Sequence, residues 1–282
     1  MIDTLSPSKS DVIVNKPLKT TCEGTESQLK QPTAEEYNLL ASLYKNRNLN
    51  KKVIDCYTKA LQFRKLTLGT LDKKTAISYN NLADAYANDG SRVQALKYYI
   101  KALNIRERLF GLNHPQTASI YSSMANIYFE DKNLEKAHTL YKKALEIRVK
   151  HLGEEHIDTA TSYQELAYFY AEGREYELAL PLFKKAVEIR RMLLKMSHPD
   201  TATSYNNLAI CYYHLFEYEK ARNALTVAIE IRSLLFDSKD PVLVTAKKNL
   251  KEIKKRISKE KRERRLSFFS KIFRPKLKRV AI

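Results

Sequence analysis

The sequence predicts an all-α protein: a right-handed α-solenoid of five 42-residue helix–turn–helix repeats followed by a C-terminal capping helix. Three observations support this fold class. One pattern of Tyr, Leu and Ala recurs every 42 residues between residues 33 and 242, without insertion or deletion. Each copy contains two apolar stripes with helical spacing. The composition changes on both sides of the repeats. Self-similarity at a fixed period indicates stacked repeats rather than one closed globule.

The pattern also sets the domain organisation. The segments are a disordered N-terminal segment (1–32), five repeats (33–74, 75–116, 117–158, 159–200 and 201–242), a capping helix (243–263) and a basic, Phe-containing tail (264–282). The first segment is polar, has no periodicity and contains three Pro, which is typical of disorder. The capping helix keeps helical spacing through Leu243, Ala246, Leu250 and Ile253 beside many Lys and Arg.

The first apolar stripe occupies positions 4, 7, 8 and 11, counted from the residue after the Thr that opens each copy. In the third copy these positions hold Tyr121, Met124, Ala125 and Tyr128. Spacings of three and four residues place side chains on one face of a helix. Each copy is therefore expected to begin with an amphipathic helix, called helix A.

The second stripe occupies positions 20, 24 and 27, which the third copy fills with Ala137, Tyr141 and Ala144. It predicts a second helix, helix B, antiparallel to the first and joined to it by a short turn. Small Ala side chains let two helices approach to about 8–10 Å. Aromatic side chains then fill the space between one pair and the next.

The helix ends have their own signals. Gly recurs after helix B at positions 69, 111 and 153, where a left-handed residue can end a helix. Pro follows at positions 115, 199 and 241, where a helix cannot simply continue. The Thr that opens each copy is the expected N-cap of helix A, and Thr33 with Glu36 has the spacing of a capping box.

The two stripes read aromatic-x-x-Leu-Ala-x-x-Tyr and Ala-x-x-x-Tyr/Phe-x-x-Ala, which resembles the tetratricopeptide repeat (TPR) signature. The junctions LFGLNHPQTASIY (109–121) and SHPDTATSYNNLA (197–209) resemble the 42-residue branch found in kinesin light chains and nephrocystin-type proteins. The resemblance covers 210 of the 282 residues. Kinesin light chains also carry an N-terminal coiled coil. Residues 1–32 contain no heptads, so no such coil is expected here.

The resemblance implies an adaptor or scaffold, similar to cargo adaptors, that binds a partner peptide or helix in a concave groove lined by the A helices. In the family, positions 2, 5, 6, 9, 12 and 13 of helix A contact the peptide. The implied partner-binding residues are Asn38, Asn80, Asn81, Asp84, Ser122, Asn126, Gln164, Tyr168, Asn206, Asn207 and Tyr213. Asn offers both a donor and an acceptor to a peptide backbone. The alternative is that these amides bond neighbouring helices of the same chain.

An Arg recurs at position 31 of every copy, as Arg64, Arg106, Arg148, Arg190 and Arg232. We expect these side chains to be solvated on helix B and paired with nearby Glu residues such as Glu146, Glu188 and Glu230. The alternative is a basic ladder along the repeats.

The chain contains no GxGxxG, Walker, GxSxG, HExxH or CxxC pattern. Catalytic residues, cofactors and metals are therefore not expected, and the protein is expected not to be an enzyme. His114, His156 and His198 recur one per junction. Because one His per repeat cannot supply ligands that converge on one ion, a structural role is expected for them.

The net charge of +18 is concentrated at the C-terminus, where residues 247–282 hold 16 Lys or Arg and three Glu. A basic amphipathic segment with Phe can bind an anionic membrane surface. The basic clusters also fit nuclear import or nucleic-acid binding, although nucleic acid is less favoured as a partner. A third possibility is a tail that is solvated or folds back on the repeats. The expected membrane or anion contacts are Arg264, Arg265, Phe268, Phe269, Lys271, Phe273 and Arg274, with Ser267 as a candidate phosphorylation site.

Three scattered cysteines, Cys22, Cys56 and Cys211, form no motif, which is typical of reduced thiols in the cytosol. The N-terminus lacks the apolar core of a signal peptide, and no apolar run has the length of a membrane span. We expect a cytoplasmic protein, with a membrane surface or the nucleus as alternatives that depend on the tail.

Overall fold

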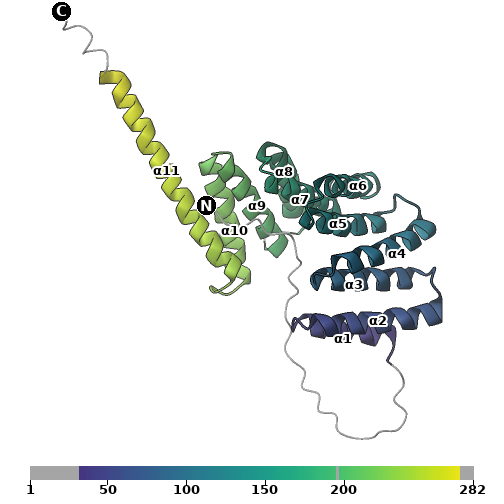
Figure 1. The fold of residues 1–282 in the computed structure, drawn as a ribbon. Helices are drawn as coiled ribbons and strands as arrows, with labels where there is room; N and C mark the ends of the chain where they lie inside the picture. Colours follow the sequence, from purple (N-terminus) through teal and green to yellow (C-terminus); the bar gives the residue numbers. More distant parts are fainter. Residues whose placement is uncertain (1–31, 195–196, 274–282) are drawn as a thin grey trace, which may run out of the picture. The chain divides into compact units, whose positions relative to one another are not determined.

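The computed structural model describes residues 32–194 and 197–273, with side chains as far as residue 270. Within these residues the chain forms eleven α-helices and no β-strand, which confirms the all-α prediction (Figure 1). The helices are α1 (Ala34–Lys45), α2 (Asn50–Leu68), α3 (Lys73–Asn88), α4 (Arg92–Phe110), α5 (Pro115–Glu130), α6 (Leu134–Leu152), α7 (Ile157–Glu172), α8 (Tyr176–Leu193), α9 (Pro199–His214), α10 (Tyr218–Leu235) and α11 (Pro241–Phe273). The N-terminal segment expected to be disordered lies outside the described residues, apart from residue 32.

The helices form two compact units, and the division falls inside α7, between Ser162 and Tyr163. In the N-terminal unit, α1 pairs with α2, α3 with α4, and α5 with α6 (Figure 1). In the C-terminal unit, α9 pairs with α10, and α11 packs on α10. Odd-numbered helices are the predicted A helices and even-numbered helices the B helices. Consecutive helix pairs are the arrangement of an α-solenoid, as the 42-residue period predicts.

Alanines lie at the helix crossings. The Ala at position 8 of helix A is at most 1% exposed in all five repeats. On the B helices, Ala102, Ala144 and Ala186 are completely buried. The adjoining core contains larger side chains such as Leu82, Tyr99 and Phe183. Small residues at the crossings therefore set how closely the helices approach, as predicted.

The glycines after α2, α4 and α6 have the positive φ angles that the sequence predicts. Gly69, Gly111 and Gly153 have φ between +82° and +87°, with ψ between 164° and 179°. This region is more extended than the left-handed helical region and is essentially restricted to glycine. It ends helix B and turns the chain towards the next helix A.

The expected role of Thr as N-cap is confirmed at Thr33. Its hydroxyl accepts a hydrogen bond from the Glu36 backbone N–H at 3.3 Å, and the Glu36 carboxylate accepts from the Thr33 backbone N–H at 2.7 Å. These two bonds complete the predicted capping box.

At the later junctions the prediction of a Thr cap is wrong, because helix A begins before the Thr. The Asp72 carboxylate caps α3, and the His114 and His198 Nδ1 atoms cap α5 and α9 by accepting backbone N–H groups at 3.2 Å. Thr75 is fully buried, and its hydroxyl donates back to the Gly69 carbonyl at 2.8 Å. The histidines thus have a structural role as caps, and the Thr residues tie helix A to the preceding loop.

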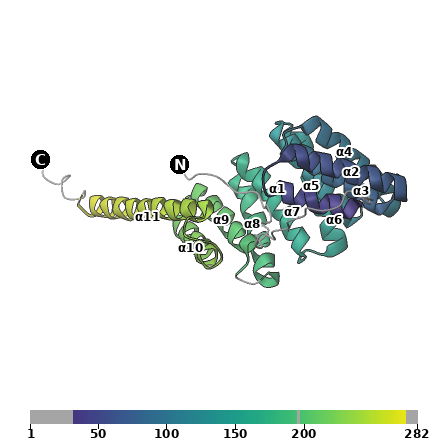
Figure 2. The same cartoon turned by 90° about the horizontal axis from the view of Figure 1, so that it is seen from below.

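Helix α11 is longer than predicted. Its first half packs on α10 through Leu243, Ala246, Ile253 and Ile257, which are at most 6% exposed. The helix does not end at residue 263 but continues to Phe273, because no Pro or Gly interrupts the sequence before then. Figure 2 shows the end of α11 extending beyond α9 and α10. None of the described helices is long and apolar enough to cross a membrane.

Candidate partner-binding surface

In the N-terminal unit, the expected partner-binding residues lie on the A helices α1, α3 and α5, and most keep some exposure. Asn38, Asn80, Asn81 and Asp84 are half-buried, and Asn126 is exposed. These residues belong to three helices that occupy the same place in successive repeats. This row is the part of the predicted groove that a partner can reach in this unit.

Some of these polar groups also bond within their own repeat. The Asn80 Nδ2 donates to Asp84 Oδ2 at 3.0 Å, and the Tyr99 hydroxyl of α4 donates to Asp84 Oδ1. In the next repeat, the Tyr141 hydroxyl of α6 donates to Asn126 Oδ1. Asp84 and Asn126 therefore tie helix A to helix B, which is the alternative role considered for these residues.

Two amides have unused bonding capacity. Among the described residues, nothing hydrogen-bonds to the half-buried Asn81 side chain. The Asn38 Oδ1 is buried and accepts no hydrogen bond. A buried acceptor without a partner costs free energy, on the order of 1–3 kcal/mol. The half-buried Asn81 amide is therefore available to bond a peptide backbone, whereas the buried Asn38 Oδ1 is out of reach of one.

The Asp84 carboxyl of this surface has a shifted pKa. Burial raises its pKa above the usual value of 3.8. The hydrogen bond from Tyr99 and the positive charges of Lys45 and Arg106 act in the opposite direction and offset part of this effect. Burial therefore costs the ionised carboxylate part of its solvation free energy, and the neighbouring donor and positive charges offset part of this cost.

Four of the expected partner-binding residues are buried, so for them the prediction of an open groove is wrong. They are Ser122, Gln164, Asn206 and Asn207, each at most 6% exposed. The Ser204 hydroxyl of α9 donates to Gln164 Oε1 of α7 at 2.8 Å, so the Gln164 side chain is buried where the two A helices meet. The remaining expected residues of the C-terminal unit, Tyr168 and Tyr213, are half-buried.

The five arginines at position 31 are buried, at most 9% exposed, which contradicts the prediction that they are solvated. Arg148 and Arg190 donate to Ser162 and Ser204, each at 2.6 Å. Each serine belongs to helix A of the following repeat. The guanidinium groups therefore join helix B of one repeat to helix A of the next.

The other three arginines make the same connection, Arg64 through a Ser and Arg106 and Arg232 through other acceptors. Arg64 donates to Ser78 at 2.9 Å, and Arg106 donates to the backbone carbonyl of Gln116. Arg232 forms two bonds to Asp240, at 3.1 and 3.2 Å. The sequence contained a signal for this role. Every copy has Arg and never Lys, and three copies have Ser 14 residues later.

The tail residues that the structure describes are exposed. Arg264, Arg265 and Ser267 lie on the free end of α11, and Phe268 and Phe269 are 63% and 56% exposed. The side chains of the remaining expected contacts, Lys271, Phe273 and Arg274, lie outside the described residues.

Among the described residues, no cluster of His, Cys, Asp and Glu has the arrangement of a metal site. Cys56 and Cys211 are free thiols in the core. Burial raises the pKa of Cys211 to about 12, so this thiol is protonated at neutral pH and is a poor nucleophile.

The comparisons with known proteins agree with this architecture. The tetratricopeptide repeat family matches residues 74–150, 139–192 and 158–233. The structure is similar to BtubC (BKLC) from P. vanneervenii, with a TM-score of 0.65, 23% identity, and 83% of this chain and 94% of that chain covered. It is also similar to the nearly identical TPR-like repeats of a candidate kinesin light chain from Podosopora anserina. Two structures of these repeats have TM-scores of 0.59 and 0.57 and identities of 21% and 22%. They cover 71% and 72% of this chain and 95% and 97% of theirs.

At these identities the structural likeness shows the fold alone. A sequence comparison with curated proteins gave no match. The family match itself spans more than half of the chain. The chain therefore belongs to the tetratricopeptide repeat family.

Proposed function

We propose that this protein is an adaptor that holds an extended peptide or a helix of a partner protein against the A helices of its repeats. Tetratricopeptide repeats mediate protein–protein interactions. The observation that most supports a peptide here is the row of amides on α1, α3 and α5, of which the half-buried Asn81 has unused hydrogen-bonding capacity. An amide side chain can both donate to and accept from a peptide backbone.

The test is a quantitative pull-down with the full-length chain and an Asn80→Ala/Asn81→Ala variant. The matched control is Gln62→Ala/Asn223→Ala, which removes two exposed amides of the B helices α2 and α10. We expect the first variant to lose partners that the control keeps. If both variants keep the same partners as the wild type, the A-helix surface is not the binding site.

The proposal includes the absence of catalysis, since TPR proteins are typically scaffolds without enzymatic activity. The expected partner-binding residues that keep exposure on α1, α3 and α5 are amides and a carboxylate bonded to Asn80 and Tyr99, and neither provides an activated nucleophile. Measurable turnover of a small substrate by the purified protein would contradict this part.

A second candidate function is attachment to an anionic membrane surface through the end of α11. It is favoured by Leu266, Phe268 and Phe269, which are 56–63% exposed on a helix end rich in Lys and Arg. Cations at the headgroups and inserted aromatic rings are the usual features of such helices. Phosphorylation of Ser267 would add about −1.5 to −2 charges and weaken this attachment.

Liposome sedimentation of the full-length chain tests the second candidate. Phe268→Ala/Phe269→Ala is expected to reduce binding to anionic vesicles, whereas Leu234→Ala/Val244→Ala removes exposed apolar side chains elsewhere and should not. Binding that the Phe substitutions leave unchanged would exclude insertion. Tighter binding to DNA than to vesicles would favour the nucleic-acid alternative. The proposed location is the cytosol, at a membrane if the tail binds one, and fluorescence imaging tests it.

A further inference from the structure

Positive charge is concentrated on the B helices of the N-terminal unit. α4 carries five Lys or Arg and one Glu, and α6 carries five Lys or Arg and two Glu. The A helices of the same repeats are nearly neutral. α3 has two Lys and one Asp, and α5 has one Glu and no cation. The B helices therefore present a different electrostatic surface from the amides on the A helices.

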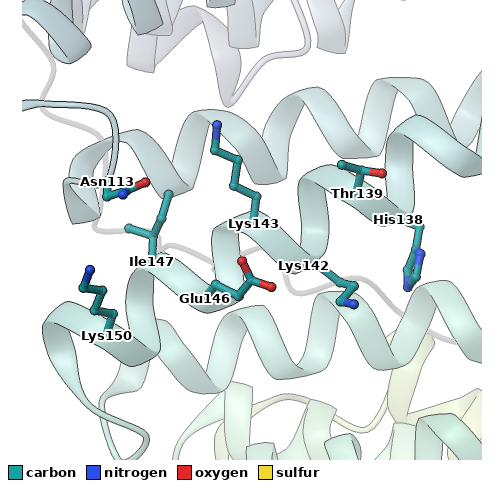
Figure 3. A pocket seen from close by; sticks show the side chains of 8 residues that line it. All are labelled: Asn113, His138, Thr139, Lys142, Lys143, Glu146, Ile147 and Lys150. Carbon is teal, nitrogen blue, oxygen red and sulfur yellow. The ribbon is translucent and has the colours of Figure 1, made fainter.

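A pocket of about 610 Å³, here called the α6 pocket, lies on this surface. Except for Asn113, which comes from the loop before α5, its lining residues belong to α6. Figure 3 shows Asn113, Ile147 and Lys150 at one end of the pocket, with Lys143 nearer the middle. At the other end are Thr139 and His138.

A second pocket of about 280 Å³, here called the α4 pocket, repeats this arrangement. Its lining residues Lys101, Ile105 and Arg108 lie 42 residues before Lys143, Ile147 and Lys150. Two consecutive repeats thus have a pocket at the same place, each with an apolar residue between two cations.

Each pocket combines an apolar floor with a lysine held against an aromatic ring. Ile105 and Ile147 are only 7% and 3% exposed. The Lys143 Nζ lies 4.2 Å from the centroid of the Tyr121 ring, and the Lys101 Nζ lies 5.7 Å from that of Tyr79. A ring face attracts the ammonium group and limits its positions without neutralising its charge.

Most of the pocket cations are available to a ligand. Within the described part of the chain, Lys101, Arg108, Lys142 and Lys150 form no ion pair. Glu146 is the one carboxylate in the lining of the α6 pocket, which also contains three Lys. The lining of the α4 pocket contains no carboxylate.

We propose that the two pockets form a docking surface for an acidic segment of a partner protein in which Asp or Glu alternate with apolar side chains. Charge complementarity selects carboxylates for the lysines, and the Ile floors accept apolar side chains. A nucleic acid fits less well, because its phosphate backbone has no apolar side chains to place on the Ile floors. A second copy of this chain offers no match either, because its long charged segment, the C-terminal tail, is basic.

This surface is separate from the A-helix residues, so it does not depend on the function proposed above. The test measures binding of a fluorescein-labelled peptide of repeated Glu-Leu-Asp-Gly units to the full-length chain at physiological salt. Long-range attraction between exposed charges is screened there beyond about 8 Å. The pocket variant is Lys142→Glu/Lys150→Glu. The control is Lys247→Glu/Lys251→Glu, which makes the same change in net charge at exposed positions of α11.

The pocket variant is expected to weaken peptide binding about tenfold or more, whereas the control changes it less than about threefold. Equal weakening by both variants would show that net charge alone governs binding and would overturn the proposal. Equally tight binding of a Glu-Gly-Asp-Gly peptide would overturn the role of the apolar floors. Binding of single-stranded DNA that competes fully with the peptide would identify a polyanion site instead. Asn80→Ala/Asn81→Ala should leave peptide binding unchanged, which separates this result from the test of the A-helix surface.

Discussion

At the scale of single residues, the buried arginines contribute most directly to the joining of consecutive repeats. Each guanidinium group leaves helix B and bonds the beginning of the next helix A. Arg190 is the most buried, at 1% exposure, and burial lowers its pKa. A buried charge is tolerated only with hydrogen-bond acceptors around it, and Gln164 and Ser204 provide them. Both bonds come from the same guanidinium nitrogen, Nη1, so the repeat junction depends on the reach of the Arg side chain.

The first prediction follows from this geometry. Arg190→Lys is expected to destabilise the protein by about 1.5–3 kcal/mol, because the Lys ammonium group ends one bond short of the Nη1 atom that bonds Gln164 and Ser204. The exposed neighbour Arg191 provides the control, and Arg191→Lys should change stability by less than about 0.5 kcal/mol. Denaturant unfolding measures both. Equal stability of the two variants would show that the buried bonds contribute little.

A second prediction concerns the half-buried carboxyl of Asp84. Burial raises its folded-state pKa above the unfolded value of 3.8, so its contribution to stability is greatest below pH 3.8 and is lost as the pH rises through the folded pKa. Asp84→Asn removes this loss and keeps an acceptor for Tyr99, as Asn126 does for Tyr141. The variant is expected to have a higher Tm than the wild type at pH 7, with a smaller difference at pH 4. A Tm difference that does not change with pH, or a lower Tm at pH 7, would contradict this. The control is Asp89→Asn, which makes the same substitution at an exposed position.

The residue scale is also where sequence reasoning was weakest. The period located every position 31, but it did not show whether the neighbouring repeat covers that position. Charged residues are mostly exposed, so solvated arginines were the natural expectation. The burial of Asn206 and Asn207 could not be predicted for the same reason. Their place on helix A was correct, but their burial depends on how adjacent A helices meet.

At the scale of the helices, small side chains control the packing of each pair. Ala137 of α6 is completely buried. Ala137→Leu is expected to cost about 1–3 kcal/mol through overpacking, because the extra atoms force the helices apart. Thr139→Leu, at an exposed position of the same helix, should have little effect. If both variants melt at the wild-type temperature, the crossing is not closely packed at Ala137.

The free end of α11 provides a prediction about local stability. Leu243 to Ile257 pack on the repeats, whereas residues 258–270 have no buried side chain. An isolated helix shorter than about 12–15 residues is marginal in water. Hydrogen exchange should therefore be fast after Ile257 and slow between Leu243 and Ile257. Equal protection along the whole helix would mean that another surface holds its end.

The helices themselves were largely predictable from the sequence. Two stripes with helical spacing placed a pair of helices in every repeat, and glycines with positive φ marked the ends of α2, α4 and α6. The starts of the later A helices differ from the prediction because His114 and His198, which precede the Thr, cap their helices. Helix α11 is longer than predicted because a change in composition does not end a helix in which neither Pro nor Gly follows the first residue.

At the scale of the whole molecule, the repeats present two chemically different surfaces. The A helices of the N-terminal unit carry amides, and its B helices carry two pockets with cations around an apolar floor. Two surfaces of this kind would let one chain hold two partners, which is what an adaptor requires. The family and the fold could be predicted because they depend on a period that the sequence displays. The pockets could not, because they are formed by the loop of one repeat and the helix of the next.

The most direct test of the central claim, that the A helices hold a partner peptide, is site-specific photo-crosslinking in cells. A photoreactive amino acid is placed at Asn81 on α3 or, as a control, at the exposed Asn223 on α10. We predict a distinct set of crosslinked partner proteins at Asn81 that is absent at Asn223. Identical products at both positions, or none at Asn81, would contradict the account.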